Sequence, residues 1–318
     1  MPATARGRRS FLQLLVGAAA GVPLARRVAA QAPSTAAPPS GVFTFTTPAF
    51  EHESVWIVSG PGGGNVVVLS SPSSTLMVNG GSSSDLFRFV SSGSNSKPVE
   101  FLFNTDWHPE HTGSNLAVAE NGGQILAHEF TKQYLSIDRP VEWQNKTHKP
   151  LPAKALPTKT FTKAGEMTFA GQLIEYGPLG QAHTDGDIYV FFRKENILAV
   201  GDVMTVGKYP IADYTSGGWL GGLVAATKTL LDLANPTTRI VPGEGPEQKR
   251  ADLQAQYDML SASRDAFVKM MRQGMSADEM LAAGATKAFD AKWGNPQLFV
   301  KTSYRGLWLH VREVGGIV

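Results

Sequence analysis

A polar loop at residues 104–115 concentrates side chains that are suited to binding metal ions. It reads Asn-Thr-Asp-Trp-His-Pro-Glu-His-Thr-Gly-Ser-Asn and follows an apolar segment, residues 99–104, that predicts a buried strand. Four metal-capable side chains fall within six residues of this loop: Asp106, His108, Glu110 and His111. Because a tight loop at a strand end can point alternate residues at two adjacent ions, this spacing predicts a metal site.

Three later segments add further side chains that could ligate a metal. His183 stands in the polar stretch His-Thr-Asp-Gly-Asp, Asp202 follows an apolar segment at residues 197–200, and Glu244 stands in Pro-Gly-Glu-Gly-Pro. The chain has no Cys, which excludes disulfides and thiolate metal sites. Any metal must therefore be held by His, Asp or Glu.

The order of these motifs resembles that of the metallo-β-lactamase superfamily over roughly residues 43–247. The family loop reads His-x-His-x-Asp-His, and a later His, a bridging Asp and a final His in Pro-Gly-His-Gly complete its two-metal site. The resemblance implies a first ligand set of Asp106, His108 and His183, a second set of Glu110, His111 and Glu244, and Asp202 as the bridge. It also implies an α+β fold, the αββα sandwich of two mixed sheets with helices outside. Residues 213–218, which precede a helix, are similar to exported members of the superfamily.

Three of the seven ligand positions depart from the family pattern, since Asp106 and Glu244 each replace a His and Glu110 replaces an Asp. Every replacement can still bind a metal, whereas a decaying site would more often lose its ligating atoms. The resemblance implies two divalent ions, zinc in the family, while the carboxylate-rich set shifts the preference toward manganese or iron. The family's Val-Asp-x-Gly motif reads Val-Asn-Gly-Gly at residues 78–81, which removes a carboxylate that orients a ligand.

The function implied by this resemblance is that of an exported hydrolase acting on a small molecule. A metal-bound hydroxide positioned by Glu110, the expected catalytic residue, would attack an ester, lactone, amide or thioester carbonyl, with β-lactams as one option. Glu is one methylene longer than the family Asp, and a shift of about 1 Å can cost about a hundredfold in rate. Two alternatives stay open: a di-iron or di-manganese oxidoreductase, and a non-catalytic binding member. The candidates for lining the substrate pocket are Trp107, Tyr209, Tyr214 and Trp219.

The secondary-structure elements that must position these side chains are expected to be mainly strands in the first part of the chain and helices in the last part. Residues 43–170 have the pattern of short strands between Gly, Ser and Asn turns, and a strand pair at residues 188–200 is followed by a helix at residues 219–233. The expected strands are 42–46, 54–59, 65–70, 75–78, 99–104, 123–128, 167–169, 173–176, 188–192, 197–200 and 239–241. Residues 248–318 predict a helical extension packed on the main domain, with helices at 249–273, from Ser276 onward and at 299–311. Glu279, three residues after Ser276, predicts a capping box.

The N-terminus has the features of an export signal. Residues 7–12, Gly-Arg-Arg-Ser-Phe-Leu, resemble the twin-arginine signal, and residues 1–30 predict a cleaved signal peptide followed by a Pro/Ser/Ala linker at residues 31–42. The apolar run at residues 11–25 is short for a membrane span, which needs about 20 apolar residues. We therefore expect transfer by the export machinery to the periplasm or outside the cell, with no stable membrane span after cleavage.

The charge balance argues against a nucleic-acid partner. The formal net charge of +2 includes five arginines in residues 1–30, and the remainder carries 24 basic against 27 acidic residues. Because the part of the chain after residue 30 is mildly acidic, its net charge gives no reason to expect attraction to nucleic acid. The sequence leaves the oligomeric state and the substrate open.

Overall fold

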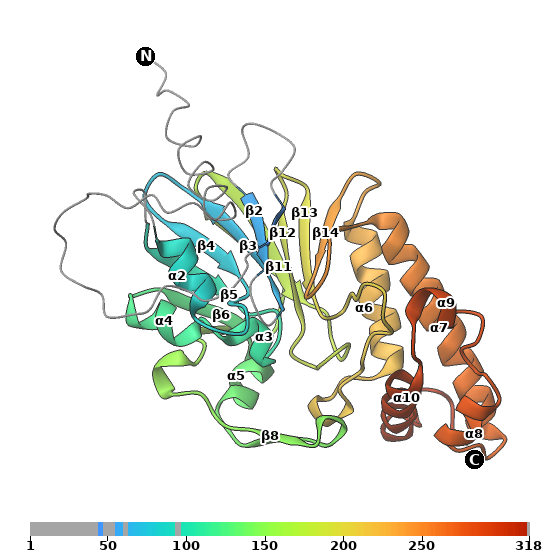
Figure 1. Ribbon diagram of the computed structural model, residues 1–318. Helices are drawn as coiled ribbons and strands as arrows, with labels where there is room; N and C mark the ends of the chain where they lie inside the picture. The colour runs from blue at the N-terminus through green and yellow to red at the C-terminus, as the bar shows by residue number, and fades with distance from the viewer. Residues whose placement is uncertain (1–43, 47–54, 60–62, 93–96, 317–318) are drawn as a thin grey trace, which may run out of the picture.

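The computed structural model describes residues 44–46, 55–59, 63–92 and 97–316. The expected signal peptide (residues 1–30) and the linker (residues 31–42) lie outside these residues, so export stays a prediction. Two mixed sheets pack against each other with helices on their outer faces, which confirms the expected αββα sandwich (Figure 1). Among the described residues no helix is both long and apolar enough to cross a membrane.

The first sheet is built from the N-terminal half of the chain, in the order β1-β2-β3-β4-β5-β6-β9. Its strands are β1 (Thr44–Thr46), β2 (Val55–Ser59), β3 (Asn65–Ser70), β4 (Thr75–Val78), β5 (Val99–Phe103), β6 (Gln124–His128) and β9 (Lys159–Phe161). Strands β1 to β4 pair antiparallel, and β4, β5, β6 and β9 pair parallel. Strands β3 and β4 are almost wholly buried runs rich in Val and Leu, as expected for strands covered on both faces.

The second sheet follows in the order β10-β11-β12-β13-β14-β15. Its strands are β10 (Gly165–Phe169), β11 (Gln172–Pro178), β12 (Ile188–Phe192), β13 (Ile197–Gly201), β14 (Arg239–Pro242) and β15 (Gln248–Lys249). All pairs are antiparallel except β13 with β14, whose connection carries helix α6 (Leu220–Leu233). Side chains from both sheets meet in one apolar layer, including Leu69 and Val78 from the first sheet and Ile174 and Val190 from the second.

Short helices cover the first sheet or connect its strands. They are α2 (Asp85–Ser91), α3 (Pro109–Thr112), α4 (Asn115–Glu120) and α5 (Glu129–Leu135). Two 3-10 turns, η1 (Glu142–Gln144) and η2 (Ala153–Ala155), and the hairpin of β7 (Arg139–Val141) and β8 (Lys146–His148) lie in the same half of the chain, whereas the 3-10 turn η3 (Tyr214–Ser216) precedes α6. The sequence pattern predicted only strands and turns before residue 170, so these helices correct it. Helices this short have too few turns to give a periodic sequence pattern, and they depend on packing for stability. Phe87 of α2 and Val118 of α4, for example, pack in one apolar cluster with strands of the first sheet.

The C-terminal extension is helical, as expected. It comprises α7 (Arg250–Arg272), α8 (Ala277–Ala282), α9 (Asp290–Trp293) and α10 (Gln297–Leu309), which lie beside α6 at one end of the molecule (Figure 1). The capping box of α8 is present, with Ser276 and Glu279 bonded to each other's backbone amides. Leu223 of α6, Leu253 of α7 and Phe299 of α10 share one apolar cluster. The extension is thus part of the packed body, and the boundary near residue 247 stays a prediction.

Candidate metal centre

The loop after β5 is shaped by side chains that flank the predicted ligands. Asn79 has a left-handed backbone (φ 66°), and its side-chain oxygen accepts hydrogen bonds from the backbone N and Oγ1 of Thr105 at 2.9 and 3.0 Å. The Asn104 amide donates to the His111 carbonyl and exchanges hydrogen bonds with Asn115. The Asn of the Val-Asn-Gly-Gly motif therefore fixes the residue before Asp106 with an amide oxygen in place of the family carboxylate.

The turn that presents the ligands is stabilised locally. The Asp106 Oδ1 atom accepts a hydrogen bond from the His108 backbone N at 2.7 Å, which closes an Asx turn. Pro109 then opens α3 at a position where its missing N–H costs nothing. Asp106, His108 and His111 are brought to the same side of this turn and are almost completely buried.

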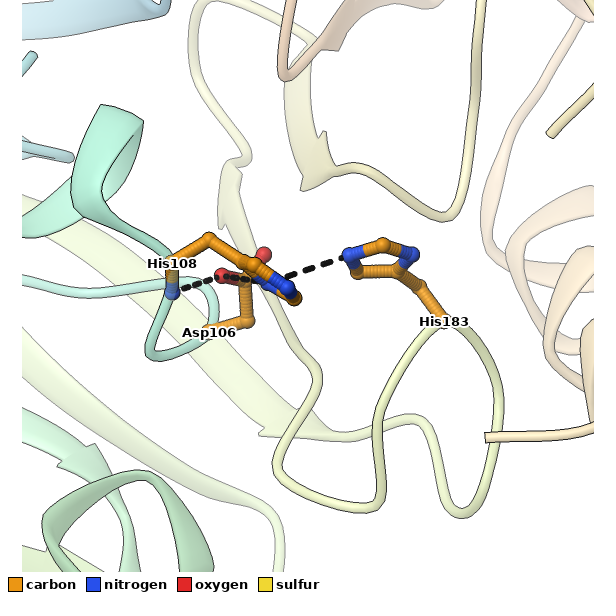
Figure 2. Close-up of side chains that lie close together, drawn as sticks. All are labelled: Asp106, His108 and His183. Atoms are coloured by element: carbon orange, nitrogen blue, oxygen red, sulfur yellow. Dashed lines mark hydrogen bonds and ion pairs between the residues drawn. The ribbon is translucent and has the colours of Figure 1, made fainter. Parts of the chain in front are cut away.

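Two groups of ligand atoms meet at this point, each with its atoms within 4.8 Å of one another: Asp106, His108 and His183 in one, and Asp106, His111 and Asp202 in the other. Figure 2 shows the first group, in which His183 approaches from a separate loop to face His108 and Asp106. Asp202 follows β13, as the sequence predicted. Five of the seven expected ligands are therefore assembled, and the Asp106 carboxylate belongs to both groups.

The orientation of these rings suits metal binding. Nδ1 of His183 lies 2.8 Å from the Ile211 carbonyl, which can only accept, so Nδ1 carries the proton and Nε2 presents a lone pair. Nε2 of His111 lies 3.4 Å from Asp106 Oδ2 and 3.3 Å from Asp202 Oδ1. Asp106 Oδ2 and both ring nitrogens of His111 are buried and make no hydrogen bond. Since an unsatisfied buried polar atom costs about 1–3 kcal/mol, these atoms fit the role of metal ligands.

Sequence reasoning missed Asp213, which supports the site from behind. Its Oδ2 lies 3.6 Å from His108 Nε2 and accepts a hydrogen bond from Ser216 Oγ at 2.7 Å. Its Oδ1 accepts from Trp143 Nε1 at 2.9 Å. The sequence signal for this residue is the Asp-Tyr-Thr-Ser turn at residues 213–216, within the segment that resembles exported members of the superfamily.

The carboxylates of the site shift the titration of its histidines. Burial lowers the pKa of His111, but Asp106 and Asp202 outweigh it and raise that pKa to about 10. Burial likewise opposes the positive charge on His108, yet Asp106 and Asp213 hold its pKa well above the usual range. For Asp202, burial raises the pKa, but the neighbouring imidazoles, His111 foremost, keep it well below its usual range.

Metal binding is expected to release protons, because a ligating imidazole must be neutral. Below about pH 10 the metal-free chain keeps the proton on His111, and the raised pKa of His108 acts in the same direction. Loading with Zn²⁺ should therefore release about two protons near pH 7.5, and the apparent affinity should fall as the pH falls. Calorimetry in buffers of different ionisation enthalpy measures the number. His111→Gln should release about one proton fewer, His310→Gln as many as the parent, and a parent that releases none would contradict the assignment.

The two expected glutamate ligands lie outside both groups. Glu110, on α3, is half-buried and lines the same pocket as His183 and Asp202. The side chain of Glu244 is 58% exposed and forms an ion pair with Lys208. Their roles as ligands therefore stay predictions.

A pocket of about 580 Å³ opens at the site and is lined by His108, Glu110, His183 and Asp202 among others. Of the four expected aromatic lining residues, Tyr209 lines it. Trp107 is buried, with its ring stacked on His108 at 4.3 Å, and Trp219 stacks on His310 at 4.5 Å. Tyr214 donates its hydroxyl to Glu142 at 3.0 Å. These three residues contribute to packing and support.

Known proteins with similar sequences and folds agree with this geometry. The sequence profile of the metallo-beta-lactamase superfamily matches residues 59–254. A curated relative, the 2,4-dinitroanisole O-demethylase subunit alpha of Nocardioides sp. (strain JS1661), is 26% identical over 185 residues, which are 57% of this chain and 51% of the relative. The chain thus matches about half the length of that relative.

Solved structures show the same fold. A metallo-beta-lactamase from Pontibacter korlensis superposes with a TM-score of 0.54 at 18% identity, covering 69% of this chain and 99% of its own. The metallo-beta-lactamase FIM-1 from Pseudomonas aeruginosa, in its mono-zinc form, gives 0.55 at 15% identity, covering 71% and 98%. With the family motifs in order on the family fold, the chain belongs to the metallo-β-lactamase superfamily, whose members are mostly metal-dependent hydrolases.

Proposed function

We propose that the chain is a metal-dependent hydrolase that cleaves an ester, lactone, amide or thioester bond of a small molecule. The observation that carries this proposal is the buried pair of His/Asp groups that share Asp106 and border a pocket. His108 and His183 would complete the ligands of one divalent ion, and His111 and Asp202 those of the other. Such ions supply a more acidic water and a Lewis acid for the scissile carbonyl.

Glu110 is the residue that we assign to proton transfer. Glu110 lines the pocket, two residues from His108, and belongs to neither group of ligand atoms. A carboxylate in that position can orient the attacking water and accept its proton, a contribution of typically 10²–10⁴-fold in rate. Zinc is the metal favoured by the family, and the two Asp ligands keep manganese or iron open.

A second candidate reaction is favoured by the matched relative, whose name assigns it the O-demethylation of 2,4-dinitroanisole. Attack of water at the methyl carbon of an electron-poor methyl aryl ether would form the new C–O bond of methanol, break the O–CH3 bond of the ether and release the phenolate, so the atoms balance without an oxidant. The same site residues would bind the ions and orient the water. The phenolate would be the leaving group, in the place that the alcohol takes in ester hydrolysis. The di-iron or di-manganese oxidoreductase and the non-catalytic member stay as alternatives, to be decided by the metal found and its redox response.

The proposal predicts chelator-sensitive hydrolysis by the purified chain. We expect turnover of at least one substrate among an aryl ester, a lactone, a thioester, a β-lactam and 2,4-dinitroanisole, with loss on metal removal and recovery on adding Zn²⁺, Mn²⁺ or Fe²⁺. Glu110→Gln should lose about 10²-fold or more in kcat. Turnover that survives complete metal removal would refute the proposal, as would a metal-loaded chain inert toward the whole panel.

A further inference from the structure

We propose that the C-terminal extension builds an apolar wall of the pocket, and that this wall selects substrates with a flat aromatic group of one or two rings. The inference rests on the proposed function only in taking this pocket as the substrate site. It assigns a role to residues beyond position 254, where the match to the family profile ends.

The extension reaches the pocket at the junction of α9 and α10. Trp293, Leu298 and Phe299 line the same space as His183 and Asp202. Leu298, in the first turn of α10, is 39% exposed although it is a large apolar side chain. Trp293 and Phe299, which line the pocket together with Leu298, are buried.

Contacts between the extension and the loop after Asp202 make the wall part of the site. Tyr209 stacks on Phe299, with ring centroids 4.7 Å apart and planes 12° apart, and its hydroxyl donates to Asp290 at 2.8 Å. Gln256 of α7 is fully buried, donates to the Val203 carbonyl at 2.7 Å and accepts from the backbone N of Thr205 at 3.2 Å. The loop that follows a metal ligand is therefore held in place by the extension, so the wall is preorganised.

The pocket lining combines apolar side chains with charged groups. Met204, Ile211 and Trp143 add to the apolar lining, while Lys208 and Glu244, also on the lining, neutralise each other as an ion pair. About 580 Å³ lies in the range of sites that hold one small ligand. A neutral molecule fits this distribution when its aromatic part lies against Leu298 and its scissile bond lies at the His/Asp groups.

Binding of 2-naphthol tests the wall without any need for turnover. The metal-free parent should bind 2-naphthol, measured by quenching of tryptophan fluorescence, and Leu298→Asp should weaken this binding roughly tenfold. Leu298→Ala should weaken 2-naphthol binding by less, and it keeps the test valid if the Asp variant does not fold. Leu309→Asp is the matched control, since Leu309 is on the same helix, is 67% exposed and does not line this pocket. It should bind within about twofold of the parent.

Turnover separates this inference from the proposed function. With metal present, Leu298→Asp should raise KM for 2-naphthyl acetate about tenfold, whereas Leu309→Asp should leave this KM within about twofold of the parent. If naphthol binding depends on Leu298 but no substrate is hydrolysed, the proposed function fails and the wall stands. If the parent does not bind 2-naphthol, or if both Leu298 variants bind it as tightly as the parent, the wall is refuted whatever the activity.

Discussion

Asp106→Ala is expected to empty both metal positions and to lower hydrolysis by about a thousandfold or more, the scale of losing a central catalytic group. The reason is geometric, because the Asp106 carboxylate is the one group common to both sets of ligand atoms. Its removal would also take away a carboxylate that lies 3.2 Å from His108 Nδ1 and 3.4 Å from His111 Nε2. Elemental mass spectrometry of the purified chain measures the metal, and kcat/KM measures the loss.

A matched control for this prediction is Asp138→Ala, which removes an exposed acid that pairs with Lys149 at the surface. We expect its metal content and activity to equal those of the parent. If Asp106→Ala instead loses only one of two equivalents, the carboxylate is not shared, and the resemblance-based scheme with Asp202 as the sole bridge would be preferred.

Gly243→Ala is expected to lower kcat/KM about a hundredfold through crowding of the metal ligands. A Cβ at this position would lie 1.9 Å from Asp202 Oδ1 and 2.9 Å from His111 Cε1. The Gly243 backbone cannot easily retreat, because its N donates to Gly201 and its carbonyl accepts from Asn65, both at 2.7 Å. Asp202 or His111 must therefore move, and a displacement of about 1 Å in a catalytic site costs on the order of a hundredfold.

The melting temperature of Gly243→Ala should be measured as well, because we expect the substitution to displace a metal ligand and not to disturb the core. A variant that melts near the parent temperature with reduced metal content would support crowding at Asp202. Parent-like metal content and kcat/KM would show that the site tolerates a methyl group there, and would contradict the tight packing of Gly243 against the ligands.

Much of the sandwich was predictable because its strands are short apolar runs bounded by Gly, Ser and Asn. Strands β3, β4 and β12 match their expected bounds, and α6 begins one residue later than expected, at Leu220. The long helix α7 was also expected, since 23 residues hold enough turns to show a helical period. The helices missed before residue 170 have four to seven residues and are stabilised by the sheet they cover.

The candidate site was predictable where motif order carries the information, and not where it depends on packing between distant segments. Asp106, His108 and His183 were expected together and lie together. The approach of Asp213 to His108 joins residues 105 positions apart in the chain and has no local signature. The same holds for Leu298, which reaches the pocket only through the packing of the extension. Glu244 shows the limit of motif order, because its side chain pairs with Lys208 at the surface and its place as a ligand stays a prediction.

The most direct test of the shared two-metal site is anomalous X-ray diffraction from crystals of the chain loaded with Zn²⁺. We expect two peaks about 3.5–4 Å apart, the usual spacing of two-metal sites. One peak should lie within bonding distance of Asp106, His108 and His183, and the other within bonding distance of Asp106, His111 and Asp202. A single peak that Asp106 does not contact, or no peak at these residues, would contradict the assignment of this site.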